Sequence, residues 1–172
     1  MKRIMVIGSG GAGKSELSRR LGEILGIEVI HLDRVYWRPN WTEPPKHDWK
    51  ETVETLVKRE SWIMDGNFGG TIEIRAAAAD TIILLDLPRI LCVWRAVKRR
   101  LKYPNRTRPD MGEGCPEKMD LEFLQWIWNF PRDSRPRLME ILRRYDKTKS
   151  ILVLKSRRDV EAFVRDIRLS PI

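Results

Sequence analysis

The sequence predicts a three-layer α/β fold in which a five-stranded parallel sheet carries helices on both faces. Two observations predict this class. Five short apolar segments recur along the 172 residues, and helical patterns separate them, which is typical of strand–helix–strand units. Two of the segments, 4–7 and 81–85, are apolar throughout except for Thr81, as expected for parallel strands buried on both faces. We expect a single domain over 1–172, because a chain of this length can bury a sizeable core.

The first strand, predicted over 3–7, leads into Gly8-Ser9-Gly10-Gly11-Ala12-Gly13-Lys14-Ser15 and a helix over 14–25 that Gly26 closes. The eight residues match G-x-x-x-x-G-K-[ST], the phosphate-binding P-loop, in its strand–loop–helix context. Glycines let successive backbone N–H groups point at a phosphate, and the helix N-terminus adds positive charge. The sequence therefore predicts that the chain binds a nucleoside triphosphate, with ATP as the expected cofactor.

Each position of this loop has an expected role. Lys14 is predicted to reach the terminal phosphates, and the hydroxyl of Ser15 is predicted to ligate Mg²⁺. The backbone around them is predicted to hold the phosphates, at Gly8, Gly10, Gly11, Ala12 and Gly13.

The next elements are predicted from short β-branched runs and helical periodicity. A second strand covers 27–30, and the aromatic, proline-rich segment 34–47 reads as a loop without regular structure. Asp48 and Glu51 resemble a capping box at the start of a helix. A third strand covers 61–64, a short helix follows over 72–79, and a fourth strand covers 81–85.

The second half of the chain alternates in the same way. A helix is predicted from Pro88 to about 101 with Ile90 and Trp94 facing inward, and a mobile flap or lid over about 102–119, where prolines, glycines and charges break every periodicity. A helical pattern from 121 is interrupted at Pro131 and resumes over 138–145. The fifth strand covers 151–154, and Ser156 with Asp159 caps the last helix.

Aspartates follow three of the predicted strands, at the carboxyl edge of the sheet where such folds bind ligands. Asp65 can hold the water shell of Mg²⁺ or orient an acceptor, although a strand-end residue that caps a turn is the alternative. Asp33 can bind an acceptor or accept its proton. Asp86 either caps the helix that starts at Pro88 or has a functional role, and the first alternative is strong. His31 is interpreted as a strand-end histidine more than as a catalytic group.

Arginines are the expected partners of a transferring phosphoryl group, because they donate two hydrogen bonds to it at once. Arg95 and Arg99 share one helical face and are predicted to take this role. Arg137 is a further candidate for the nucleotide, and Arg75 for the acceptor. The remaining arginine candidates are Arg106, Arg108, Arg132 and Arg135. The rings of Tyr36, Trp37 and Trp41 either stack on a substrate or pack the proline-rich loop.

Composition sets broader limits. Lys+Arg 33 against Asp+Glu 24 gives a net charge of +9, which favours polyanions but does not distinguish nucleic acid from phosphate-bearing substrates. Cys92 and Cys115 form no metal-ligand pattern, so a zinc-stapled lid is excluded and a reduced cytoplasmic location is expected. No apolar run reaches transmembrane length, so no membrane partner is expected. The oligomeric state is left open.

The order of these motifs resembles the nucleoside monophosphate kinases of the adenylate kinase type, which are P-loop kinases with sheet order 2-3-1-4-5. In that family an Asp-Gly pair ends a strand, and an Arg-x-x-x-Arg helix, here 95–99, introduces a lid over ATP. The segments HLDRVYW, DGNF, TRPDMGEGCPE and WIWNFP (31–37, 65–68, 107–117 and 126–131) resemble a bacterial family labelled DNA topology modulation protein, or FlaR-type.

This resemblance implies an ATP- and Mg²⁺-dependent kinase, and the family label implies an effect on DNA supercoiling. The chain departs from adenylate kinases at Asn67 and Phe68, where those enzymes carry an apolar residue, proline and arginine. The segment HLD at 31–33 is similar to kinases of small hydroxylated metabolites, such as shikimate and gluconate kinase. The acceptor is therefore a nucleoside monophosphate or a hydroxylated metabolite. A nucleic-acid-associated regulator and an ATPase switch without an acceptor are the alternatives.

Overall fold

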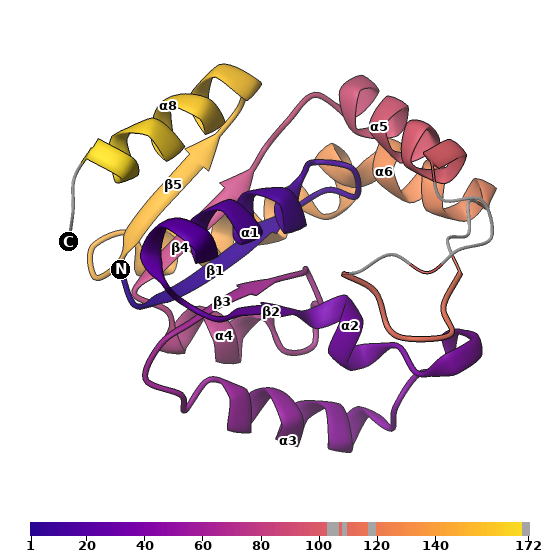
Figure 1. Ribbon diagram of the computed structural model, residues 1–172, viewed down its shortest axis with the longest axis horizontal. Helices are drawn as coiled ribbons and strands as arrows, with labels where there is room; N and C mark the ends of the chain where they lie inside the picture. The colour runs from indigo at the N-terminus through magenta and orange to yellow at the C-terminus, as the bar shows by residue number, and fades with distance from the viewer. Residues whose placement is uncertain (103–106, 108–109, 117–119, 170–172) are drawn as a thin grey trace.

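The computed structural model describes residues 1–102, 107, 110–116 and 120–169. It contains one parallel sheet with the order β2-β3-β1-β4-β5, so the predicted class and strand order are confirmed (Figure 1). The five strands are β1 (Arg3–Gly8), β2 (Val29–His31), β3 (Trp62–Asp65), β4 (Thr81–Leu85) and β5 (Ser150–Leu154). Each lies within about two residues of its prediction, which is the usual uncertainty of element boundaries.

Helices cover both faces of this sheet (Figure 1). They are α1 (Lys14–Leu25), α2 (Leu32–Tyr36), the 3₁₀ turn η1 (Pro39–Trp41), α3 (Lys46–Leu56), α4 (Ile72–Ala78), α5 (Arg89–Lys102), α6 (Leu121–Asp133), α7 (Arg135–Tyr145) and α8 (Arg157–Leu169).

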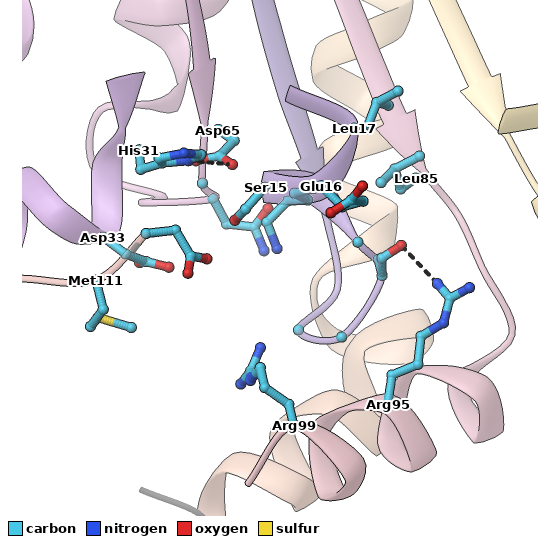
Figure 2. A pocket seen from close by; sticks show the side chains of 18 of the residues that line it. Ser15, Glu16, Leu17, His31, Asp33, Asp65, Leu85, Arg95, Arg99 and Met111 are labelled. Atoms are coloured by element: carbon cyan, nitrogen blue, oxygen red, sulfur yellow. Dashed lines mark hydrogen bonds and ion pairs between the residues drawn. The ribbon is translucent and has the colours of Figure 1, made fainter. Parts of the chain in front are cut away.

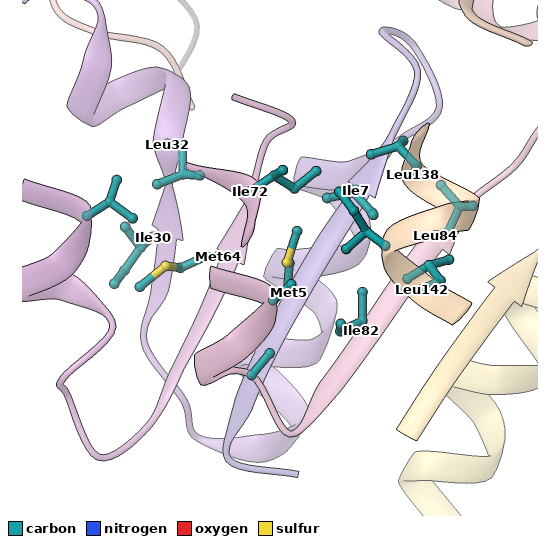
Figure 3. Close-up of a cluster of buried hydrophobic side chains, with 14 of the residues drawn as sticks. Met5, Ile7, Ile30, Leu32, Met64, Ile72, Ile82, Leu84, Leu138 and Leu142 are labelled. Carbon is teal, nitrogen blue, oxygen red and sulfur yellow. The ribbon is translucent and has the colours of Figure 1, made fainter. Parts of the chain in front are cut away.

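Strand side chains alternate between the two faces and build two separate cores. Met5 and Ile7 of β1 point toward α3, α4 and α7 (Figure 3), whereas Ile4 and Val6 pack against α1, α5 and α8. All four residues are fully buried. The two cores fix the sheet from both sides, so the loops at its carboxyl edge emerge from a rigid base.

The structure corrects three sequence predictions about helix ends. The segment 34–47 is not irregular, because α2 and η1 occupy part of it. The helix expected to start at Asp48 begins at Lys46 after Pro45, and no side chain caps it; proline suits this place because its fixed φ favours a helix start. The chain remains helical through Pro131 and turns only at Ser134.

The predicted cap of α8 is confirmed. The carboxylate of Asp159 accepts from the backbone N–H of Ser156, and the hydroxyl of Ser156 accepts from the backbone N–H of Asp159.

The inward face of α5 also differs from the prediction. Ile90 is 70% exposed and Trp94 is 56% exposed, while Cys92 and Ala96 are buried. The helix therefore presents its small residues to the sheet. This lets its backbone approach the P-loop closely, which its larger residues would prevent.

Within the predicted flap, the structure describes residues 102, 107 and 110–116, and residues 110–116 are in contact with the rest of the domain. Residues 110–116 lie beside α2 and η1 (Figure 1), and Met111, Gly112 and Cys115 are buried. The N–H of Asn40 donates to the carbonyl of Gly114 (3.1 Å), and Trp41 Nε1 donates to the carbonyl of Pro116 (3.2 Å). This part of the segment is docked on the turn that follows α2, and Arg106 and Arg108 lie outside the described residues.

Candidate active site

A cleft of about 1640 Å³ opens at the carboxyl edge of the sheet, and the P-loop forms its floor. Its other walls come from the ends of β2 and β3, the turn 37–43, α5, α6 and residues 110–111. Figure 2 shows the side chains that point into it, including Ser15, Asp33, Asp65 and Arg99. The cleft therefore brings together residues that lie far apart in the sequence.

The P-loop presents an uncapped helix N-terminus to this cleft. Gly13 precedes α1 with φ 95°, a left-handed conformation that favours glycine, and no side chain caps the helix. The first N–H groups of a helix have no intrahelical partner. Twelve residues of α1 align their dipoles behind these donors, so an anion is favoured at this point.

Two other loop glycines make room for neighbouring backbone. A Cβ at Gly8 would lie 2.5 Å from the carbonyl oxygen of Leu85, and a Cβ at Gly11, where φ is 74°, would lie 2.1 Å from that of Cys92. Gly8 does not line the cleft. These glycines let β4 and α5 pack directly against the loop.

Lys14 is folded back onto its own loop. Its Nζ donates to the carbonyl oxygens of Gly8 and Ser9, both at 3.0 Å. Burial lowers the pKa of Lys14, and the nearby charges of Asp33 and Asp65 act in the opposite direction. The ammonium is thus held by weak neutral acceptors, which a phosphate oxygen can replace.

Asp65 is paired with His31 across the sheet. The parallel register places the two residues side by side on β3 and β2, and His31 Nδ1 lies 3.0 Å from each carboxylate oxygen of Asp65. Burial lowers the pKa of His31, but the hydrogen bond and charge of Asp65 outweigh this, and the pKa lies above its ordinary value. From the sequence, His31 is expected to be a strand-end histidine more than a catalytic group. Here it orients the carboxylate.

Asn67, which follows β3, connects this strand to the P-loop through two side-chain hydrogen bonds. Its Oδ1 accepts from the N–H of Gly8 (3.1 Å), and its Nδ2 donates to the carbonyl of the same residue (2.9 Å). Arg75 stabilises the turn formed by residues 66–68. Its side chain is fully buried and donates to the carbonyls of Gly66, Asn67 and Phe68. Arg75 therefore does not reach the cleft as an acceptor ligand.

The other arginine candidates separate into two groups. Arg95 and Arg99 line the cleft from α5 (Figure 2), and Arg95 Nη1 donates to the carbonyl of Ala12 (3.2 Å). Three others face elsewhere. Arg135 forms an ion pair with Asp86 (2.9 Å), Arg137 donates to the carbonyl of Gly69 (3.4 Å), and Arg132 pairs with its neighbour Asp133. Arg137 and Asp86 therefore do not line the cleft that contains the P-loop.

An aromatic cluster built around α2 and η1 borders the cleft. Tyr36 contacts Trp37, Trp49 and Phe68 with ring centroids 4.7–5.0 Å apart, and Trp37 contacts Trp41 at 5.3 Å. Trp41 has φ 62°, which is a strained conformation for a bulky residue and is held by the contacts to residues 114–116. Trp37, Trp41 and Phe68 line the cleft.

A divalent cation would find few protein ligands in this cleft. Among residues 1–102, 107, 110–116 and 120–169, no three His, Cys, Asp or Glu side chains converge on one point. The Ser15 hydroxyl and the Asp65 carboxylate both border the cleft, and a carboxylate whose two oxygens share one ring nitrogen of His31 keeps lone pairs for metal-bound water. This donor set suits Mg²⁺, which keeps several waters and relies on phosphate oxygens for the rest.

The comparisons with known proteins identify the fold. Shikimate kinase from Acinetobacter baumannii, solved with shikimate, has a TM-score of 0.61 at 16% identity, over 97% of this chain and 90% of that one. Deoxyadenosine kinase from M. mycoides, solved with dCMP and a flexible dCDP, has a TM-score of 0.51 at 15% identity, over 95% of each chain. The chain thus has the P-loop kinase fold.

No protein-family model matches the chain, and no curated protein sequence matches it. The resemblance to the FlaR-type family is therefore not supported beyond the shared kinase fold. No helix among the described residues is long and apolar enough to cross a membrane.

Sequence reasoning missed the pair His31–Asp65, the clasp of Asn67 on Gly8, and the docking of residues 110–116. A signal existed for the first two, since HLD and DGN both follow strands that belong at one edge of the sheet. The docked segment carried no periodic pattern, so its position was accessible only from the fold.

Proposed function

We propose that this protein is a phosphotransferase that passes the γ-phosphoryl group of ATP, with Mg²⁺, to the hydroxyl of a small acceptor. One observation carries the proposal: the uncapped N-terminus of α1 and Lys14 share one cleft with Asp33, Asp65 and the α5 arginines. Donors for phosphates and carboxylates for an acceptor hydroxyl thus border the same space. The fold shared with shikimate kinase and deoxyadenosine kinase supports the same reaction class.

The donor side of the reaction is assigned to the loop and α5. Backbone N–H groups from Gly10 to Ser15 and the ammonium of Lys14 hold the phosphates of ATP. Arg95 and Arg99 donate to the transferring group, whose oxygens carry most of the charge in the transition state. Ser15, and Asp65 through water, would hold Mg²⁺, which would neutralise charge on the phosphates.

The acceptor side is assigned to Asp33. The acceptor oxygen bonds to the γ-phosphorus while the bond from that phosphorus to the bridging oxygen breaks, and ADP leaves with the bond electrons. The hydroxyl proton passes to the carboxylate of Asp33, which lines the cleft from the first turn of α2. The acceptor is a hydroxylated metabolite, a nucleoside or a nucleoside monophosphate.

The test is a screen of small hydroxyl compounds that follows ADP and the phosphorylated product together. We expect at least one acceptor to yield both in equal amounts, and Lys14→Ala to lower turnover by roughly 10³-fold or more. Lys50→Ala is the matched control, because Lys50 lies on the exposed face of α3, outside the cleft lining, and is ion-paired with Glu54 (3.7 Å). Wild-type turnover in folded Lys14→Ala protein would contradict the assignment.

Product analysis also separates the two alternatives left open by the sequence. Phosphate release without a phosphorylated acceptor would indicate an ATPase switch. DNA binding that weakens steeply with salt would favour a nucleic-acid-associated regulator, because such binding depends on counterion release.

A further inference from the structure

We infer that Asn67 is a positioning residue for phosphoryl transfer, and that it acts through the carbonyl of Gly8 on the ammonium of Lys14. The inference rests on the phosphotransferase function proposed above and adds a residue to its donor side. It comes from four hydrogen bonds that meet at the end of β1, two made by Asn67 and two by Lys14.

The backbone pairing of β1 with β3 ends before the P-loop begins. The register runs from Arg3 with Trp62 to Val6 with Asp65, and the N–H of Gly66 donates to the carbonyl of Val6 (3.2 Å). Beyond this point the carbonyls of residues 66–68 accept from the buried Arg75. The side chain of Asn67, and not the backbone of this turn, continues the pairing with β1.

The carboxamide of Asn67 takes the place of a peptide group. Its Oδ1 accepts from the N–H of Gly8, and its Nδ2 donates to the carbonyl of the same residue. Only asparagine and glutamine side chains carry an amide acceptor and an amide donor side by side. The two bonds hold Gly8 at φ 143°, a conformation that favours glycine, where β1 becomes the P-loop.

Lys14 rests on the carbonyl that Asn67 holds. Its Nζ donates to the carbonyls of Gly8 and Ser9, both at 3.0 Å. Each of these carbonyls has a second donor, since Asn67 Nδ2 bonds to the first (2.9 Å) and the N–H of Ala12 to the second (3.2 Å). Both lone pairs of each oxygen are thus engaged, which fixes the direction of the carbonyl. The position of the ammonium therefore depends on Asn67 at one carbonyl and on the loop itself at the other.

This arrangement keeps the ammonium at the cleft. Lys14 and Asn67 both line the cleft, whereas Gly8 does not. An ammonium has three N–H donors, and the two carbonyls take two of them. A phosphate oxygen thus meets a donor whose long side chain is already ordered, and such preorganisation lowers the barrier to transfer. Without Asn67, the Gly8 carbonyl loses its orientation and Lys14 loses this defined position.

The turn that carries Asn67 has other supports. Arg75 is fully buried and donates to three of its carbonyls, and Gly66 is bonded to β1 through its N–H. Loss of the Asn67 side chain should therefore leave the turn in place and act on Gly8. Support of the turn and positioning of Lys14 consequently lead to different expectations.

A double-mutant cycle separates the two roles. Binding of a non-hydrolysable ATP analogue with Mg²⁺ is measured by calorimetry for the wild type, Asn67→Ala, Lys14→Ala and the double variant. Asn67→Ala should weaken binding roughly tenfold in the wild-type background and less than about twofold in the Lys14→Ala background, because residues that act through one contact are not additive. Equal effects in the two backgrounds would overturn the inference. Asn129→Ala, on α6 outside the cleft lining, is the matched control and should bind as the wild type does.

The length of the phosphate chain gives a second measurement. Lys14 is assigned to the terminal phosphates, so Asn67→Ala should weaken the binding of AMP by less than about twofold. An equal loss for AMP and for the ATP analogue would show general disruption of the loop and would contradict the positioning of Lys14.

Asn67→Asp tests which of the two bonds to Gly8 matters. An ionised aspartate still accepts from the N–H of Gly8, but it cannot donate to the carbonyl on which Lys14 rests. This variant should bind the ATP analogue no better than Asn67→Ala, and wild-type affinity would show that the carbonyl is not the link. Asn67→Ser replaces Asn67→Ala in the cycle if the latter does not fold.

Turnover distinguishes the inference from the function on which it rests. With an acceptor from the screen above, Asn67→Ala should lower kcat by about tenfold or more and change the KM for the acceptor by less than about twofold. An unchanged kcat, or a change in the KM for the acceptor alone, would overturn the inference and leave the phosphotransferase standing. Failure of the wild type to phosphorylate any acceptor would overturn both.

Discussion

At the scale of single residues, the site depends on polar side chains that hold one another. His31 fixes the carboxylate of Asp65, and Asn67 fixes the backbone of Gly8. Buried polar groups are costly unless they are satisfied, and they define one geometry when they are. The orientation of Asp65 toward the cleft is therefore a property of its neighbours as much as of its own strand.

The pKa of His31 gives a pH-dependent prediction. Burial lowers this pKa, the hydrogen bond and charge of Asp65 and the charge of Asp110 raise it, Arg19 lowers it slightly, and the net shift is upward. A raised pKa in the folded state contributes stability that is fully present below the unfolded value of about 6.5 and is lost as the pH rises through the folded value. His31→Gln should thus cost more free energy of unfolding at pH 5.5 than at pH 8.5, measured by urea denaturation.

An NMR titration checks the same point directly. The chain has two histidines, and the His31→Gln variant identifies the signal of His31. The pKa of His31 should lie above the ordinary histidine value of about 6.5, and titration at or below that value would show that the pair is not formed as described.

Arg75 gives a prediction about stability. Arg75→Met keeps the side-chain length but removes the donors to three carbonyls in the turn 66–68. Buried acceptors without partners are costly, so we expect a loss of roughly 2–4 kcal/mol in the free energy of unfolding. Arg137→Met, on an exposed residue with a single 3.4 Å contact, should change it by less than about 0.5 kcal/mol. Equal effects in the two variants would contradict a supporting role for Arg75.

At the scale of elements, the P-loop is shaped by the two elements that pack on it. β4 meets Gly8 and α5 meets Gly11 at distances that leave no space for a Cβ. α5 can approach because its inward residues are Cys92 and Ala96. The position of Arg95 and Arg99 over the loop thus follows from glycine on one side and small residues on the other.

Gly11→Ala tests this contact against a matched glycine. The new Cβ would lie 2.1 Å from the Cys92 carbonyl at φ 74°, whereas at Gly26, with φ 66°, nothing lies within 4 Å. Gly26→Ala should therefore cost only the left-handed strain, about 1–2 kcal/mol. Gly11→Ala should cost more and should also weaken ATP binding at least tenfold, measured by calorimetry, because α5 must move away. Unchanged ATP affinity in Gly11→Ala would show that the contact does not shape the loop.

At the scale of the whole molecule, the cleft is bordered by both cationic and acidic side chains, although the chain as a whole carries +9. The P-loop, α1 and α5 contribute to its lining together with segments 31–43 and 110–111. Ligand binding should couple these parts, because a ligand that binds only the folded state stabilises all of it.

A thermal shift measures that coupling. A non-hydrolysable ATP analogue with Mg²⁺ at 100 times its Kd should stabilise the fold by about 2.7 kcal/mol, which corresponds to a rise in Tm of roughly 5–10 °C for a chain of this size. Lys14→Ala should show a much smaller rise at the same concentration. Adenosine at this concentration is the control for the base alone, and an equal rise with adenosine would contradict binding through the phosphates.

Much of the fold was accessible from the sequence because strand and helix patterns are local. The apolar runs of β1 and β4, the P-loop and the Ser156–Asp159 cap each depend on residues a few positions apart, and their physical causes act over the same distance. Short elements were the exception. The five residues of α2 are too few to show a helical period, and the packing of Tyr36 on Trp49 and Phe68 fixes them instead.

The sequence alone was therefore sufficient to predict the α/β class, and it showed the P-loop pattern and the acids that follow the strands. Only the tertiary structure decided which side chains meet: His31 with Asp65, Asn67 with Gly8, Asp86 with Arg135, and Trp41 with Pro116. These partners are 34 to 75 residues apart, so no local pattern encodes them. They follow from the parallel register of the strands and from the packing of helices on the sheet, which place distant residues at one edge and so assemble the cleft.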